Sequence, residues 1–246
     1  MAKPKARGTP SSTLSVEEAA MQNFGRFCLA CGAFAPLLWG ALVGLTALSV
    51  ADYSHVRDLI SELTWGDTAS AALMRAAGFG LSGLLYVICA AYVAFRLRAD
   101  RSAVFGCLLL LIGGVARLGA GIYPCDESCA PYRPTSTQDM HFLALQMSYG
   151  LLILSAFVWG VVVNRYQALR WFSTVSFGCA TWSIVTVVML VTQEAQRGQY
   201  ERFATGLLSV WMITWVVALW RAGVWREDLA WRKPEYAPRR RKFRRP

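Results

Sequence analysis

Four residues have side chains suited to acid, base or nucleophilic chemistry: Ser61, Glu62, Asp126 and His141. His141 or Glu62 would act as the acid or the base, and Ser61 as the nucleophile or as an orienting hydroxyl group. We expect the four to come together above Arg117, whose planar guanidinium group matches a phosphate or a carboxylate. This set predicts hydrolysis or group transfer on an anionic substrate.

Arg117 interrupts an otherwise uncharged stretch in which a membrane-spanning helix is expected. It precedes Pro124 by seven residues, so at about 1.5 Å per residue it lies roughly 10 Å below the end of that helix. A charge at this depth is costly and rarely faces lipid. We therefore expect Arg117 to point inward, toward the carboxylate of Asp58, Glu62 or Asp126, toward carbonyl groups, or toward an anionic ligand. The predicted ligand-binding residues are Arg117, Arg75, His55, Asp58 and Gln146.

Two cysteines, Cys125 and Cys129, lie four residues apart in the loop after this helix. In an oxidising compartment they could close a small disulfide ring, although such tight rings are geometrically demanding. A catalytic zinc ion would need His55, His141 and a carboxylate, because the chain has only two histidines. We predict the disulfide, and we predict no metal and no other cofactor.

Long uncharged stretches dominate the 246-residue sequence, in which 55% of the residues are hydrophobic and 16% are charged. A soluble protein would place charges every turn or two on the exposed faces of its helices. Each stretch is instead long enough to cross the bilayer core, which takes about 20 residues. We predict an all-α polytopic membrane protein with a six-helix transmembrane bundle in residues 24–225. The predicted spans are residues 27–50, 71–95, 103–123, 142–163, 171–192 and 203–225.

The loop that contains Ser61 and Glu62 has an amphipathic pattern. Its apolar residues Leu59, Ile60 and Leu63 recur at helical spacing, and polar residues share the other face. This pattern predicts a short amphipathic helix on the outer face of the membrane. Its polar row would face either water or a cavity between the spans.

Small residues recur where the second and third spans are expected to meet. Such residues let the backbones of two membrane helices approach closely. Close packing there would leave a wider outer half, in which Gln146, Ser148 and Tyr149 could complete a pocket at Arg117. The glycines concerned are Gly78, Gly80, Gly83, Gly113, Gly114 and Gly121.

Basic residues are divided unevenly between the two predicted sides of the membrane. Nineteen Lys and Arg residues lie on the side of both termini, and four lie in the opposite loops. The positive-inside rule then puts residues 1–23, a disordered tail, and residues 226–246, a basic tail, in the cytoplasm. We expect the basic tail to contact membrane lipids through anionic headgroups, at about 1 kcal/mol per basic residue, rather than nucleic acid.

The loops also carry the pattern of a known family, together with the glycine-rich second span. The segments that carry it are Tyr53–His55, Ile60–Leu63, Gly121–Asp126 and His141 at the start of the fourth span. Over residues 25–225 the chain resembles the prokaryotic "domain of unknown function 998" family of six-helix membrane proteins. It differs from that family at Thr64 and Trp65 and in its cysteine pair. The resemblance implies the fold and the inner membrane of a bacterium, and it implies no established reaction.

Three functions remain open. The sequence favours a non-catalytic membrane component that senses, scaffolds or partners another membrane protein, or that binds a lipid headgroup. The alternatives are a membrane-embedded hydrolase or transferase for a lipid-linked anionic substrate at the outer leaflet, and a small-solute transporter. Candidate residues that converge on one open cavity would favour a ligand site. Residues that are bound by one another, without a pocket, would favour a structural clamp.

Overall fold

The computed structural model describes residues 16–129 and 133–226, and within these ranges the chain is helical and has no strand. Six helices are long and apolar enough to cross a membrane. Hydrocarbon offers no hydrogen-bond partners, so a spanning segment must satisfy its own backbone groups, as a helix does. The chain is therefore an all-α, multi-pass membrane protein, as the sequence predicted. The elements are α1 (Val16–Ala47), α2 (Ala69–Leu73) continued through a π-helix (Met74–Leu81) into α3 (Ser82–Arg96), α4 (Arg101–Ile122), α5 (Ser136–Val163), α6 (Arg170–Thr192) and α7 (Arg197–Arg221).

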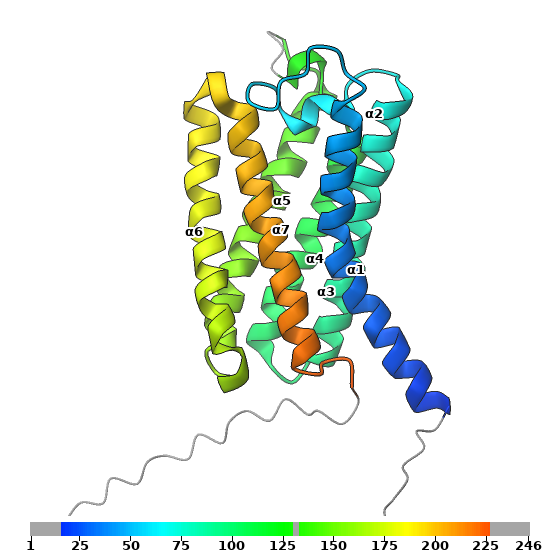
Figure 1. The fold of residues 1–246 in the computed structure, drawn as a ribbon, viewed down its shortest axis with the longest axis vertical. Helices are drawn as coiled ribbons and strands as arrows, with labels where there is room; N and C mark the ends of the chain where they lie inside the picture. Colours follow the sequence, from blue (N-terminus) through cyan, green and yellow to red (C-terminus); the bar gives the residue numbers. More distant parts are fainter. Residues whose placement is uncertain (1–15, 130–132, 227–246) are drawn as a thin grey trace, which may run out of the picture.

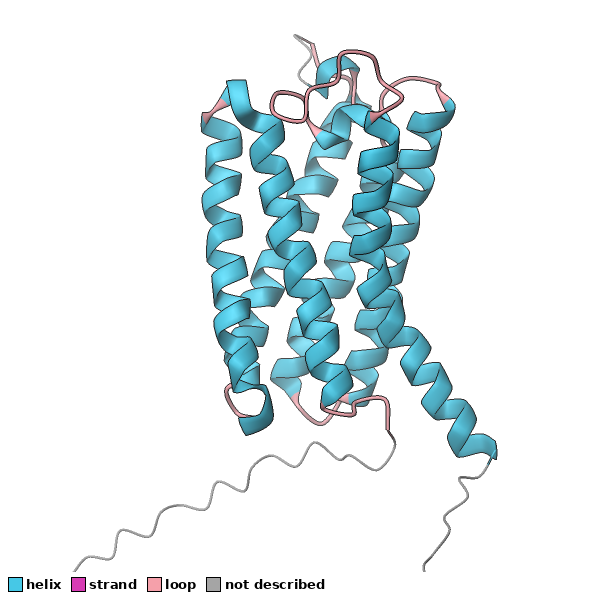
Figure 2. Ribbon diagram, viewed as in Figure 1, coloured by secondary structure: helices cyan, strands magenta, loops and turns pink. Residues whose placement is uncertain are grey.

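The six spans form one bundle, and the described chain begins and ends at the same end of it (Figure 1). Helix α1 lies beside α3 and α7, α4 packs against α3 and α5, and α6 packs against α5 and α7. We call the end that holds Val16 and Arg226 the terminal end, and the opposite end the loop end. The longer connections gather at the loop end (Figure 2).

Several helices extend beyond the membrane spans that the sequence predicted. Helix α1 begins at Val16, inside the predicted tail of residues 1–23, and both α5 and α7 begin six residues before their predicted spans. The prediction stopped each span at charged or polar residues, but polar groups also extend helices by capping them. Thr135 caps α5 in this way, because its hydroxyl accepts the N–H of Gln138 at 3.2 Å. Most of the basic tail, residues 227–246, lies outside the described residues.

The glycines allow the close helix contact that the sequence predicted. A Cβ atom on Gly83 would lie 2.7 Å from the carbonyl oxygen of Gly114, and one on Gly121 would lie 2.6 Å from the carbonyl oxygen of Arg75. Both distances are too short for real contacts, so only glycine fits there. Helices α3 and α4 therefore touch backbone to backbone.

The amphipathic helix expected in the first loop is shorter than its pattern predicted. The chain makes turns through residues 54–58, and only Ile60–Thr64 forms a 3₁₀-helix. The backbone at Leu59 is extended, and the N–H of Ile60 donates to the Glu201 carboxylate at 2.6 Å. A bond to a distant helix thus replaces the local bond that a longer helix would have needed.

Candidate functional site

Arg117 is buried in α4, with 6% of its surface exposed. Its Nε donates to the Ser82 hydroxyl at 2.8 Å, and that hydroxyl donates in turn to the carbonyl of Gly78 in the π-helix. The guanidinium carbon lies 3.8 Å from the ring centroid of Trp39 and 5.5 Å from that of Phe79. Aromatic faces attract a cation, most strongly when water is excluded. The inward orientation expected from the sequence is therefore observed.

The described part of the chain gives Arg117 no ion pair. The ion pairs among the described residues join Asp58 to Arg57 at 2.7 Å, Glu62 to Arg197 at 3.0 Å, and Asp100 to Arg165. The carboxylate partner suggested by the sequence is thus replaced, in this region, by a hydroxyl group and aromatic rings.

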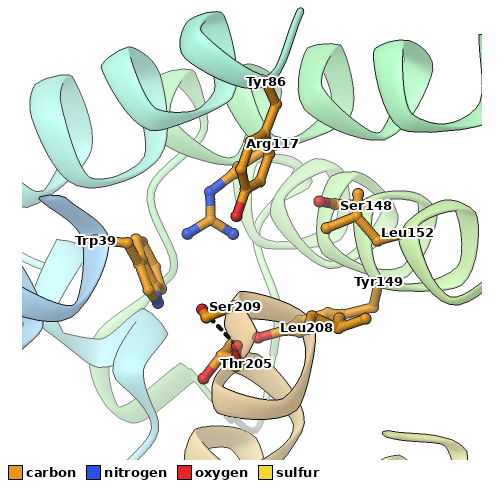
Figure 3. Close-up of a pocket in the computed structure, with 9 residues that line it drawn as sticks. All are labelled: Trp39, Tyr86, Arg117, Ser148, Tyr149, Leu152, Thr205, Leu208 and Ser209. Carbon is orange, nitrogen blue, oxygen red and sulfur yellow. Dashed lines mark hydrogen bonds between the residues drawn. The ribbon is translucent and has the colours of Figure 1, made fainter. Parts of the chain in front are cut away.

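The guanidinium group faces a small cavity among α1, α3, α4, α5 and α7 (Figure 3). Its volume is about 10 Å³, roughly the space that one water molecule needs. Gln146, a predicted ligand residue, is exposed and is not part of the lining. The lining residues are Trp39, Tyr86, Arg117, Ser148, Tyr149, Leu152, Thr205, Leu208 and Ser209.

Glu201, which is 3% exposed, links this cavity to the first loop. Its carboxylate accepts the N–H of Ile60 at 2.6 Å and the hydroxyl of Ser61 at 3.4 Å. One turn along α7, the hydroxyl of Thr205 lines the cavity and donates to the Glu201 carbonyl at 2.9 Å. Ser61, the predicted nucleophile, is therefore buried against a carboxylate that the sequence analysis did not select.

Arg202, the next residue, uses all three of its guanidinium nitrogens to hold the first loop. Nε donates to Nδ1 of His55 at 3.1 Å, Nη1 to the carbonyl of Asp58 at 2.9 Å, and Nη2 to the hydroxyl of Tyr53 at 2.5 Å. Burial raises the pKa of that tyrosine hydroxyl, and the nearby Arg202 opposes the shift only in part. The His55 ring and the backbone carbonyl of Asp58 are therefore bound to α7 and not to Arg117.

Asp58 also closes the turn of the first loop on itself. Its carboxylate accepts the N–H of Ser54 at 2.8 Å and the Nε of Arg57 at 2.7 Å. Burial acts to raise the pKa of Asp58, but these bonds outweigh burial and lower it.

Glu62 joins the first loop to the second loop and to α7. Its Oε1 accepts the N–H of Leu59 and the Nη2 of Arg197, both at 3.0 Å, and Arg197 also donates to the carbonyl of Ser128 at 3.2 Å. Burial raises the pKa of Glu62, although both donors act in the opposite direction. We call the following residues the loop clamp: Glu62, Arg197, Glu201 and Arg202.

Asp126 and His141 stabilise the second loop and the end of α4. The Asp126 carboxylate accepts the N–H of Thr135 at 2.9 Å and its hydroxyl at 2.8 Å. Nδ1 of the fully buried His141 lies 3.0 Å from the carbonyl oxygen of Ala120 and 2.5 Å from that of Tyr123. Carbonyl oxygens only accept hydrogen bonds, so Nδ1 carries a proton.

Thr64 connects the two loops. The structure contains a disulfide between Cys125 and Cys129, with a Cα–Cα distance of 5.2 Å, and the N–H of Cys125 donates to the Thr64 hydroxyl at 3.3 Å. Arg75 donates through Nη1 to the carbonyls of Thr64 and Gly66, both at 2.8 Å. Arg75 is thus bound to the loop backbone and does not line the cavity.

The described ranges contain no group of three His, Cys, Asp or Glu residues that could hold a metal ion. The two histidines belong to different clusters, because His55 binds Arg202 and His141 binds the end of α4. The structure does not bring together the zinc ligands that the sequence allowed.

Helix α7 contributes residues to the site that were not predicted from the sequence. Arg197 and Arg202 are two of the four basic residues that the sequence places in the opposite loops, and Glu201 is not among the predicted site residues. A usable signal was present, because Glu201, Thr205 and Ser209 recur at four-residue spacing and place a polar stripe on an apolar helix.

Comparison with known proteins gives one match. The sequence model of a family described as "Protein of unknown function (DUF998)" matches residues 33–218. This is the family that the loop residues resembled, and the match includes the cavity, the disulfide and the whole loop clamp. No similar curated protein and no similar solved structure was found.

Proposed function

The chain belongs to the DUF998 family of proteins of unknown function, and on that premise we propose that it is a non-catalytic membrane component whose loop end is a structural clamp. One observation carries the proposal. Ser61, Glu62, Asp126 and His141 each bind a different partner, and none of them lines the cavity at Arg117. A hydrolase would need such groups around one reacting atom. Their arrangement instead supports a scaffold or a partner for another membrane protein.

The free energy of unfolding of two variants in mild detergent tests this proposal. Glu62→Gln weakens the charge-assisted bond from Arg197, and Asp126→Asn weakens the two bonds from Thr135, so each variant should lower the free energy of unfolding by about 1 kcal/mol. Replacing residues of an active site is often neutral or stabilising, because such sites store strain. Stability that is unchanged or higher in both variants would contradict the clamp.

Glu127→Gln is the matched control for these two variants. Glu127 is exposed in the same loop as Asp126 and makes no hydrogen bond or ion pair with another described residue. The control should unfold like the wild type. A loss as large as that of Asp126→Asn would mean that the loop responds to its net charge rather than to its bonds.

Arg117 favours a second function, the binding of an anionic group such as a lipid headgroup. Its cation is buried without an ion pair in the described ranges, and it faces hydroxyl groups of Ser148, Tyr149 and Ser209 across the cavity. The cavity has space for about one water molecule, so a headgroup would enter only after the loop end opens.

Mass spectrometry of co-purified lipids tests this second function. Arg117→Met keeps an unbranched side chain and removes the charge, so the variant should lose one class of anionic lipid that the wild type retains. Ser209→Ala, a neutral change in the same cavity, should keep that lipid. Equal retention by the wild type and Arg117→Met would remove the ligand hypothesis.

We further propose that the terminal end faces the cytoplasm of a bacterial cell, with the basic tail on anionic headgroups. The support is the excess of basic residues on that side, nineteen against four. In intact cells an impermeant thiol reagent should label Asp67→Cys in the exposed first loop and spare Arg98→Cys at the terminal end. The reverse pattern would invert the topology.

A further inference from the structure

Two arginines lie over the ring of one tryptophan at the terminal end of the bundle, and a third binds the backbone of the same segment. The guanidinium carbon of Arg26 lies 4.0 Å from the ring centroid of Trp225, and that of Arg226 lies 4.7 Å from it. Arg96 reaches the same segment, where its Nε donates to the carbonyl of Val224 at 3.0 Å. We call Arg26, Arg96 and Arg226 the arginine cluster.

The arginine cluster has no acidic partner in the part of the chain that the structure describes. The ion pairs found there involve Arg57, Arg165 and Arg197, none of which belongs to the cluster. Three like charges in one place repel one another unless an anion lies among them. The cluster therefore matches a ligand of negative charge.

An apolar cavity of about 110 Å³ adjoins the arginine cluster. Phe24 of α1, Tyr92 and Phe95 of α3 and Trp225 line it, and so does Arg96, a member of the arginine cluster. It is about ten times larger than the cavity at Arg117. An elongated apolar group fits this space better than a free inorganic ion does.

The segment after α7 positions Trp225 for this arrangement. Gly223 has a φ of +73°, which reverses the chain, and the N–H of Val224 donates back to the carbonyl of Leu219 at 3.2 Å. This is the common glycine-terminated end of a helix. Gly25 brings α1 against the same region, because a Cβ atom there would meet the Tyr92 hydroxyl oxygen at 2.2 Å. The site is thus built by the glycine-terminated end of α7 and by the close contact of α1 with the Tyr92 side chain of α3.

We propose that the arginine cluster and its cavity bind one anionic phospholipid of the bilayer. The phosphate group lies on the guanidinium groups, and part of an acyl chain packs against Phe24 and Phe95. Both halves of the ligand meet complementary chemistry, because arginine binds phosphate oxygens and the cavity wall is aromatic. The helices that build the site are membrane spans, so their ends lie at the level of the headgroups.

Native mass spectrometry in detergent tests this site with two lipids of identical chains, phosphatidylglycerol and phosphatidylcholine. The wild type should bind phosphatidylglycerol more tightly. Arg26→Gln removes one exposed guanidinium group and should weaken that binding about fivefold, the effect of about 1 kcal/mol. Arg101→Gln, at the same end of the bundle but outside the cluster, is the control and should change binding less than about twofold.

A third variant, Gln22→Trp, tests the cavity rather than the charge, because Gln22 lines it and a larger side chain would fill it. It should lose phosphatidylglycerol binding while its unfolding midpoint stays at the wild-type value. Three results would each overturn the proposal. The wild type could bind the two lipids with equal affinity, or Arg26→Gln and Arg101→Gln could lose equal affinity. Inorganic phosphate could also displace the lipid when present at the same concentration. If Gln22→Trp does not fold, the arginine variants decide the test.

Discussion

The two ends of the bundle use their arginines in different ways. At the loop end, Arg197 and Arg202 donate to a loop far away in the sequence and so join separate parts of the chain. At the terminal end, Arg26 and Arg226 lie over the ring of Trp225, and neither has an ion pair within the described ranges. The comparison teaches that arginines at one end join separate parts of the chain, whereas Arg26 and Arg226 at the other end pack on an aromatic ring and leave their charges without an ion pair in the described residues.

Asp100 also joins separate parts of the chain, and it does so at the terminal end. As the N-cap of α4 it accepts the N–H of Ser102 at 3.0 Å, and it also accepts the hydroxyl of Tyr166 at 2.7 Å and the Nη1 of Arg165 at 3.5 Å. Burial acts to raise the pKa of Asp100, but the bond from Tyr166 and the cap outweigh burial and lower it. Together with Arg96, which donates to the carbonyl of Val224, Asp100 gives the terminal end polar contacts of the kind that dominate the loop end.

The largest effect is expected where the loop clamp meets backbone. A Cβ atom on Gly198 would lie 2.2 Å from the carbonyl oxygen of Asp58, and neither backbone can move freely. Gly198→Ala should therefore lower the free energy of unfolding by about 3 kcal/mol. Gly206→Ala, in the same helix with no atom within 4 Å, should raise it by about 0.5 to 1 kcal/mol. Similar values for the two variants would mean that the loop does not dock on α7.

A smaller effect should separate the arginines of the two ends. Arg202→Gln removes hydrogen bonds to His55, Asp58 and Tyr53, so the free energy of unfolding should fall by about 2 to 3 kcal/mol. Arg98→Gln removes one exposed contact with the ring of Phe95 and should cost less than about 0.5 kcal/mol. If denaturant unfolding showed equal losses of stability in Arg202→Gln and Arg98→Gln, the arginines of the two ends would not differ in their contribution to the fold.

The smallest expected effect is a dependence of the free energy of unfolding on pH. The pKa values of Asp58 and Asp100 are lowered in the folded protein, so each carboxylate adds stability above its unfolded pKa of about 4. That stability is lost as the pH falls through the lower, folded value. Asp58→Asn and Asp100→Asn should each cost about 1 kcal/mol at pH 7 and progressively less toward pH 3. If the loss of stability did not change with pH, the variants would act through altered packing rather than through the loss of a negative charge. Asp67→Asn, at an exposed position, is the control.

Much of the fold could be predicted because its cause is local. A long uncharged stretch must become a helix in hydrocarbon, and glycines such as Gly83 and Gly114 mark a close contact wherever two such helices meet. The inward orientation of Arg117 follows from the same physics, since a buried charge avoids lipid.

The partners at the loop end could not be predicted in this way. The role of Glu201 depends on a loop that approaches it from 141 residues away in the sequence. The same bond stops the amphipathic pattern near Ile60 from forming a longer helix, because local periodicity contains no information about a distant acceptor. Gln146 shows the converse, since its polarity suggested a lining position and its place on α5 exposes it.

The contact of Arg117 with Trp39 has an electrical consequence. A unit charge that crosses a whole membrane gains or loses about 2.3 kcal/mol for each 100 mV of potential. At a depth of roughly 10 Å in a hydrocarbon core of about 30 Å, Arg117 lies about a third of the way through the membrane. A potential of about 100 mV would therefore change its energy by less than about 1 kcal/mol. The ring and the Ser82 hydroxyl hold the guanidinium in place. A change in membrane potential therefore changes the energy of α4 only slightly, and it does not move the guanidinium charge of Arg117 across the membrane.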